Sequence, residues 1–201
     1  MKKVVAFLGS PRPNGYTAKL VERVLEGAKA AGAEVVTYSL NDEGIKGCQG
    51  CFYCRNHADC ATKDKLYPMY EDIKSACGIV GGFPIYFGTV SGQAKLWIDR
   101  MYPMLGDGHV PRYPGKKAVM VYAQANGDDN AFADAIRTNN SLVKIWGWEL
   151  TESLLVYGDV APGYTIPEEL FDRAYEAGRK FVEYNITNQI PVFYDTHPQF
   201  H

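Results

Sequence analysis

The chain has 201 residues, of which 46% are hydrophobic and 22% are charged, and its formal net charge is −2. Positive and negative side chains are mixed along it, which excludes a basic stripe for nucleic acid and a polybasic patch for a membrane surface. No apolar segment approaches the roughly 20 residues that span a bilayer, and Met1-Lys2-Lys3 leads into a short strand rather than a signal-peptide run. We therefore expect a cytoplasmic protein with one sizeable core and no nucleic-acid or membrane partner.

A buried strand, a polar loop and an amphipathic helix follow one another at the start of the sequence. The strand is the apolar run at residues 4–8, and the loop covers residues 9–16. The helix has one apolar face, made of Leu20, Val21, Val24, Leu25 and Ala28. In such a unit the first free N–H groups of the helix point into the loop, so that an anion is favoured there.

The side chains of this loop suit a single phosphate group. The loop lacks the Gly-Lys pair of a mononucleotide loop before Thr17, and Gly9 is followed by Ser-Pro-Arg, unlike a dinucleotide loop. It offers a hydroxyl at Ser10 and at Thr17, an amide at Asn14 and a guanidinium at Arg12. The alternative is an ordinary strand-to-helix turn with Thr17 as the N-cap, and the loop alone leaves both interpretations open.

The rest of the sequence alternates strands with helices. Further strands are expected at residues 34–40, 78–84, 118–122 and 150–157. Further helices are expected at about 68–76, around 132–146, and from Pro167 onward. Another is expected around Ala94, Ile98 and Met101, with these three side chains facing inward. Five strands and five helices predict one α/β domain, residues 1–185, with a doubly wound five-stranded parallel sheet in three layers. A strand order of 2-1-3-4-5 places a ligand crevice outside the carboxyl ends of strands one, three and four.

Three loops then line that crevice, at residues 9–16, 84–89 and 124–128. The second reads Pro-Ile-Tyr-Phe-Gly and offers backbone N–H and C=O groups together with two flat side chains, Tyr86 and Phe87. These groups suit the edge and the face of an aromatic ring. Ordinary packing of the two aromatic side chains is the alternative.

Four cysteines lie close together in a long polar loop at residues 41–65. Cys48, Cys51, Cys54 and Cys60 follow C-x2-C-x2-C-x5-C, and three thiolates at such steps can bind three corners of a cubane while the fourth closes it. Tetrahedral zinc and a loop without metal are the other interpretations that the spacing leaves open. Cys77 is expected to be a small buried side chain rather than a ligand.

These motifs, in this order, resemble those of the flavodoxin-like NAD(P)H-dependent FMN reductases, and among them the iron–sulfur flavoproteins. The resemblance covers about residues 1–185, and its carriers are residues 9–20, 48–54 with Cys60, and 84–88 with Lys95, Asp99 and Arg100. The chain departs from the family pattern at Tyr16, where Asn or Ser is usual. It also has a single acid, Asp64, where the family often has two in a row.

The resemblance implies a flavodoxin-like fold, FMN as the cofactor and a [4Fe–4S] cluster on the four cysteines. It implies that the FMN phosphate is bound by Ser10, Arg12, Asn14, Gly15 and Thr17, with the backbone of Tyr16. It implies that the isoalloxazine lies among Pro84, Ile85, Tyr86, Phe87 and Gly88, with Gln124, Asn126 and Gly127 along its far edge. No catalytic side chain is named, because the flavin itself carries the chemistry.

The expected activity is electron transfer through FMN between NAD(P)H or a ferredoxin-like donor and an acceptor such as a quinone or free flavin. A cluster-free NAD(P)H-dependent FMN or quinone reductase, a flavin sensor or carrier, and a zinc-stabilised module without flavin are the alternatives. The apolar residues in 186–201, such as Phe193 and Phe200, predict that this tail packs at the subunit interface of a homodimer or homotetramer.

Overall fold

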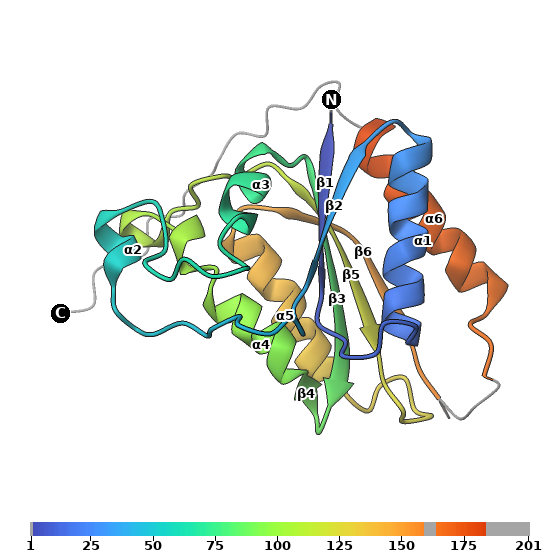
Figure 1. Ribbon diagram of the computed structural model, residues 1–201. Helices are drawn as coiled ribbons and strands as arrows, with labels where there is room; N and C mark the ends of the chain where they lie inside the picture. The colour runs from blue at the N-terminus through green and yellow to red at the C-terminus, as the bar shows by residue number, and fades with distance from the viewer. Residues whose placement is uncertain (1, 159–163, 184–201) are drawn as a thin grey trace, which may run out of the picture.

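A central parallel sheet with helices on both faces forms the computed structural model, which describes residues 2–158 and 164–183 (Figure 1). The strands are β1 (Lys3–Leu8), β2 (Glu34–Ser39), β3 (Gly78–Tyr86), β4 (Thr89–Val90), β5 (Lys117–Ala123) and β6 (Glu149–Val156). The helices are α1 (Tyr16–Ala30), α2 (Tyr53–Asn56), α3 (Met69–Ser75), α4 (Gly92–Asp99), α5 (Ala133–Ile145) and α6 (Glu168–Glu183). Two short 3-10 helices, η1 (Tyr102–Met104) and η2 (Asp107–His109), follow α4.

The five long strands are parallel and lie in the order β2-β1-β3-β5-β6. This order confirms the predicted doubly wound sheet, since β5 and β6 are the fourth and fifth parallel strands in the chain. One expectation was incomplete, because residues 84–89 were expected to form a loop. Instead β3 continues to Tyr86, and β4 returns beside it as a short antiparallel strand.

The helices cover the two faces of the sheet unequally. Helices α1 and α6 lie together on one face, and α3, α4 and α5 lie on the other (Figure 1). The backbones of α1 and α6 touch, because a Cβ atom at Gly27 would lie 2.0 Å from the carbonyl oxygen of Tyr175, and one at Gly178 would lie 1.8 Å from that of Val24. Glycine is therefore required at both contact points of this helix pair.

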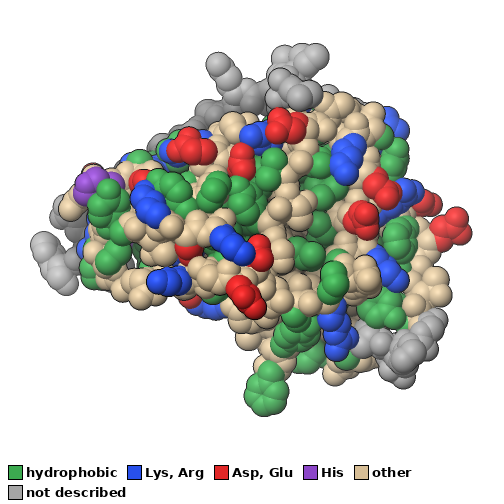
Figure 2. All heavy atoms as spheres, in the orientation of Figure 1, with side chains coloured by type: hydrophobic (Ala, Val, Ile, Leu, Met, Phe, Trp, Pro, Cys, Tyr) green, Lys and Arg blue, Asp and Glu red, His purple; other side chains and the backbone are tan. Residues whose placement is uncertain are grey.

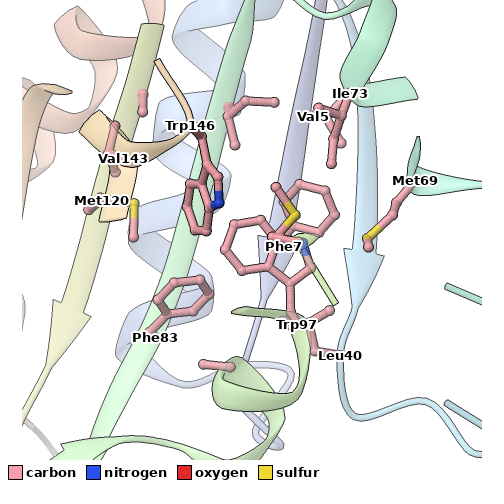
Figure 3. Close-up of a cluster of buried hydrophobic side chains, with 14 of the residues drawn as sticks. Val5, Phe7, Leu40, Met69, Ile73, Phe83, Trp97, Met120, Val143 and Trp146 are labelled. Atoms are coloured by element: carbon pink, nitrogen blue, oxygen red, sulfur yellow. The ribbon is translucent and has the colours of Figure 1, made fainter. Parts of the chain in front are cut away.

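Aromatic side chains fill the core between the sheet and α4 (Figure 3). The ring centroids of Phe7 and Trp97 are 4.6 Å apart, and those of Trp97 and Trp146 are 5.4 Å apart. Trp97 is fully buried, whereas Ile98, which the sequence pattern assigned to the inner face of this helix, is only half-buried. The large indole takes the central position of the helix and fixes α4 against β1.

None of the helices in the described ranges is long and apolar enough to cross a membrane. Charged side chains of both signs are interspersed over the face shown in Figure 2, as the composition predicted. The predicted interface tail, 186–201, lies outside the described residues.

Candidate functional site

Strand pairing brings the three predicted loops to one edge of the sheet. Leu8 of β1 pairs with Gly82 of β3, and Pro84 of β3 pairs with Ala123 of β5. The chain leaves each of these strands within a residue or two of the paired positions. The loop after β1, the hairpin after β3 and the loop after β5 are therefore neighbours, as the strand order predicted.

The loop after β1 is folded back on itself. The Oγ of Ser10 accepts a hydrogen bond of 3.2 Å from the N–H of Arg12, and the N–H of Gly15 donates one of 3.1 Å to the carbonyl of Arg12. Ser10 is buried, while the side chains of Arg12 and Asn14 are exposed. The loop is thus held by its own polar groups, and the guanidinium and amide remain available to a ligand.

Helix α1 begins without a side-chain cap. Its N-cap is Gly15, and the first backbone hydrogen bond runs from the N–H of Lys19 to the carbonyl of Gly15 at 3.0 Å. The interpretation of Thr17 as the N-cap is wrong, because Thr17 is the second residue of the helix, where it is buried against Gly82. The N–H groups of Tyr16, Thr17 and Ala18 have no acceptor in the described part of the chain. Such an end favours an anion.

Gly9 fixes this loop against the neighbouring elements. Its N–H donates to the carbonyl of Gly82 at 2.8 Å, and its carbonyl accepts from the Oγ of Ser91 at 2.7 Å. A Cβ atom at Gly9 would lie 2.9 Å from that of Ala94 in α4, which is closer than such atoms approach. Only glycine fits at this position.

The hairpin after β3 presents two aromatic side chains to solvent. Tyr86 pairs with Thr89, and the two residues between them, Phe87 and Gly88, have φ angles of +50° and +89°. A two-residue turn with positive φ at both positions twists with the flanking strands, but Phe87 adopts it at a steric cost. The side chain of Phe87 is fully exposed, whereas Pro84 and Ile85 are buried. The tip is a flat apolar surface held in a strained conformation.

The loop after β5 contains a buried polar atom without a partner. Gln124 is 2% exposed, its N–H donates to the carbonyl of Val156 at 2.9 Å, and its Nε2 donates to the carbonyl of Asp128 at 2.7 Å. Its Oε1 accepts no hydrogen bond within the described residues. Asn126 and Gly127 are exposed beside it. An unpaired buried acceptor is unfavourable, so this position suits a ligand that donates an N–H group.

The four cysteines lie in one neighbourhood, in a loop that also contains the short helix α2. Burial raises the pKa of the Cys54 thiol, and the nearby Cys48, Cys60 and Cys51 raise it further. All the cysteines are free thiols, with Cys48 and Cys51 exposed. Among the described residues, no three His, Cys, Asp or Glu side chains converge in an arrangement ready for a metal ion. The donor atoms are present, but the sulfurs do not converge.

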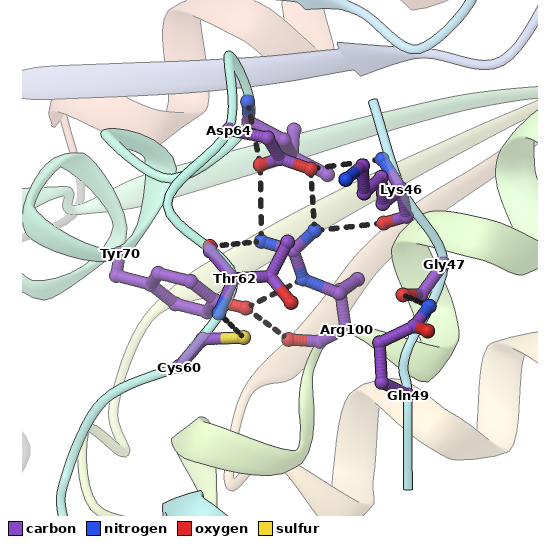
Figure 4. A network of polar contacts seen from close by, with 9 residues as sticks. Lys46, Gly47, Gln49, Cys60, Thr62, Asp64, Tyr70 and Arg100 are labelled. Carbon is purple, nitrogen blue, oxygen red and sulfur yellow. Dashed lines mark hydrogen bonds and ion pairs between the residues drawn. The ribbon is translucent and has the colours of Figure 1, made fainter. Parts of the chain in front are cut away.

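Two charged residues form a buried ion pair at the base of the cysteine loop (Figure 4). Arg100 Nη1 lies 2.9 Å from Asp64 Oδ2, and the two side chains are 0% and 8% exposed. Burial alone would raise the pKa of Asp64, but the hydrogen bonds and the charge of Arg100, together with two backbone N–H groups, lower it below its usual value. Both groups are therefore charged at neutral pH.

A family model described as NADPH-dependent FMN reductase matches residues 2–147. The chain belongs to this FMN reductase family. An iron–sulfur flavoprotein of Methanocaldococcus jannaschii is 34% identical over 160 residues, which are 80% of this chain and 78% of that protein. One of Archaeoglobus fulgidus is 28% identical over 183 residues, 90% of this chain and 79% of that protein.

A solved structure also has the same fold. An NAD(P)H:quinone oxidoreductase from Methanothermobacter marburgensis superposes with a TM-score of 0.66, over 89% of this chain and 98% of that one, at 17% identity. The FMN reductase family, the flavodoxin-like fold and an FMN-dependent oxidoreductase activity are thereby confirmed. The individual contacts of the cofactor stay predictions.

Two contributors to the site were not assigned a role from the sequence of this FMN reductase. Ser91 caps α4 and donates to the carbonyl of Gly9. Arg100 pairs with Asp64; the resemblance had singled out these two charged residues but gave neither of them a role. A signal was present for Arg100, because it continues the buried face of α4 after Ala94 and Trp97. A buried arginine requires a carboxylate partner, and Asp64 is the single acid that stands after Cys60 where the family often has two.

Proposed function

We propose that this FMN reductase is an electron-transfer enzyme of the iron–sulfur flavoprotein type. FMN binds across the three loops at the sheet edge, and a [4Fe–4S] cluster binds at Cys48, Cys51, Cys54 and Cys60. Electrons enter from NAD(P)H or a ferredoxin-like protein and leave to a quinone, a free flavin or a protein acceptor. The strongest support is the unpartnered Oε1 of Gln124 at the edge where the three loops meet.

The polar groups of the loop after β1 match the phosphate of FMN. The free N–H groups of Tyr16, Thr17 and Ala18 and the side chains of Arg12 and Asn14 suit the phosphate, because all are donors or carry positive charge. The buried hydroxyl of Ser10 holds the loop in shape and leaves its second lone pair for the phosphate region.

The flavin ring fits the other two loops. The backbone of Pro84, Ile85 and Gly88 borders the ring, and the flat side chains of Tyr86 and Phe87 cover it. The Oε1 of Gln124 accepts from the ring imide N–H, with Asn126 and Gly127 beside it. Bound FMN supplies hydride and single-electron chemistry, while these residues orient it and limit the access of water.

The case for the cluster rests on the donor set and on the relatives. The four thiols lie near one another, since Cys48, Cys51 and Cys60 all act on the thiol of Cys54, and they follow C-x2-C-x2-C-x5-C. Thiols in such a set are the ligands that iron–sulfur clusters take. The two relatives described above carry the name iron–sulfur flavoprotein. The sulfurs must draw together by a change within the loop. Free thiols also suit a reducing compartment such as the cytoplasm.

The exposed hairpin tip supports assembly of a homodimer or homotetramer. Phe87 is fully exposed and held in a strained turn, as expected for a side chain that meets a second copy of the chain. Light scattering at micromolar concentration tests this part, and a monomer would contradict it.

The test of the whole proposal is an absorption spectrum of protein purified without oxygen, with iron, sulfide and zinc measured on the same sample. Flavin bands, a broad shoulder that dithionite bleaches and about four irons per chain are the expected result. Flavin bands without iron would indicate a cluster-free reductase, and zinc in the sample would indicate a structural metal site. Steady-state oxidation of NAD(P)H with a quinone or free flavin then separates an enzyme from a sensor or carrier.

A further inference from the structure

The guanidinium of Arg100 uses all five of its N–H donors. Nη1 donates to the carbonyl of Lys46 at 2.7 Å and to Asp64 Oδ2 at 2.9 Å, and Nη2 donates to the carbonyl of Thr62 at 3.2 Å and to Asp64 Oδ1 at 3.2 Å. Nε donates to the hydroxyl of Tyr70 at 3.2 Å. Figure 4 shows these acceptors arranged around the guanidinium. An arginine has no further donor to offer.

These acceptors come from both ends of the cysteine loop. Lys46 precedes Cys48 by two residues, and Thr62 follows Cys60 by two residues. The carboxylate of Asp64 joins the same two ends of the loop, because it also accepts from the N–H of Lys46 at 2.8 Å. One buried ion pair therefore closes the segment that contains all four thiols.

The last cysteine is tied directly to this closure. The N–H of Thr62, whose carbonyl is bound by Arg100, lies 3.4 Å from the Sγ of Cys60 (Figure 4). The hydroxyl of Tyr70 donates to the carbonyl of Arg100 at 2.7 Å, which fixes the tyrosine as well. The position of Cys60 thus follows from the position of the guanidinium.

We propose that Arg100 is the positioning residue of the four-cysteine site. It holds the two ends of the loop together so that Cys60 stays within reach of the ligand bound by the other three thiols. The role of the site as a cluster site rests on the proposed function; the closure of the loop does not. Lysine cannot replace arginine here, because a single ammonium cannot bind two carbonyls and a bidentate carboxylate in one plane.

The first test compares wild type with the double variant Arg100→Leu/Asp64→Leu. Removing both charges leaves no lone buried charge, so we expect the protein to fold, while the carbonyls of Lys46 and Thr62 lose their donors. Arg173→Leu is the matched control, because Arg173 is partly exposed and pairs with Glu152 far from the loop. Arg100→Lys is a second variant that keeps the charge if the double variant does not fold.

Two readouts are measured on each protein. The first is the rate of tryptic cleavage after Arg55, which is exposed within the loop, in the metal-free protein. The second is iron and sulfide per chain after anaerobic reconstitution, with FMN content and the melting temperature on the same sample. The closure predicts cleavage about tenfold faster in both Arg100 variants and iron below half of the wild-type value, with FMN content kept.

The outcomes separate the two proposals. Unchanged cleavage and unchanged iron in the Arg100 variants would overturn the role of Arg100. A parallel loss of FMN and iron would also overturn it, because it would indicate a general structural role. If wild type takes up no iron while it binds FMN, the proposed cluster is wrong, and the cleavage rates alone decide whether Arg100 holds the loop.

Discussion

The Oγ of Ser91 donates a hydrogen bond of 2.7 Å to the carbonyl of Gly9. The same oxygen accepts from the N–H of Ala94 and so caps α4. The loop after β1 and the helix after the hairpin are therefore held by one buried hydroxyl. Since α4 spans eight residues, or about 12 Å, and ends next to Arg100, it joins the proposed phosphate loop to the cysteine loop.

Replacing Ser91 by alanine tests this joint. The substitution removes the cap of α4 and leaves the buried carbonyl of Gly9 without its donor, so we expect a loss of about 2 kcal/mol in the free energy of unfolding. Urea unfolding measures it. Ser141→Ala is the matched control, because the Ser141 hydroxyl is exposed and donates to the carbonyl of Thr138 in its own helix. Equal effects of the two substitutions would contradict the joint.

Replacing Gln124 by leucine tests the cofactor contact at the β5 loop. The apolar side chain cannot accept from the flavin imide, so the dissociation constant for FMN should rise about tenfold. Quenching of flavin fluorescence on binding measures it. Gln93→Leu is the control, because Gln93 lies on the outer side of α4 and bonds to Asn41. An unchanged constant would show that Gln124 does not contact the flavin.

Replacing Phe87 by asparagine should raise stability and lower activity together. Asparagine tolerates the left-handed conformation that Phe87 occupies, so the free energy of unfolding should increase by about 1 kcal/mol. The loss of the flat ring should reduce kcat/KM with a quinone acceptor. Thermal unfolding and NAD(P)H oxidation measure the two effects. A variant that gains stability and keeps full activity would show that Phe87 has no role in the proposed site.

The Asp72 carboxylate should make folding sensitive to acid. It accepts from Lys3 Nζ at 2.8 Å and from the hydroxyl of Tyr38 at 2.5 Å. Burial alone would raise the pKa of Asp72, but these hydrogen bonds and the charge of Lys3 lower it below its usual value. The resulting stability is present above the unfolded pKa of about 4 and is lost as the pH falls through the lower folded pKa.

Melting temperatures of wild type and Asp72→Asn between pH 6 and pH 2 check this dependence. The wild-type value should fall more steeply with acid, and the two curves should converge at the lowest pH. Glu26→Gln is the control, because its pairing with Arg23 is exposed. Parallel curves for wild type and Asp72→Asn would contradict the prediction.

The sheet and the place of the ligand crevice were predictable from the sequence because both follow from local pattern. Apolar runs mark the parallel strands, and the segments that follow Leu8, Pro84 and Ala123 then meet at one edge. The hairpin was not predicted, because a turn of Phe87 and Gly88 lacks the Asn-Gly or Asp-Gly signature of such turns. Its strained residue is kept by the surrounding structure rather than by its own preference.

The contacts that hold the site together are long-range, and a single sequence does not reveal their partners. Arg100 and Asp64 are separated by 36 residues, and Ser91 and Gly9 by 82 residues. Once Trp97 is placed inside, the three-residue step from Trp97 to Arg100 indicates that Arg100 is buried, but not which acid meets it. For the same reason Trp97 rather than Ile98 took the inner position, since the indole fits between Phe7 and Trp146.

The five satisfied donors of Arg100 also bear on when the cysteine loop loses its conformational entropy. The guanidinium closes the loop through the backbone carbonyls of Lys46 and Thr62 and not through the thiols, so the cost of bringing residues 46 and 62 together is met during folding. An incoming ligand then has to order only the short stretch between them. Pre-organisation of this kind favours rapid capture and retention at low ligand concentration, without requiring a stronger bond to any one thiol.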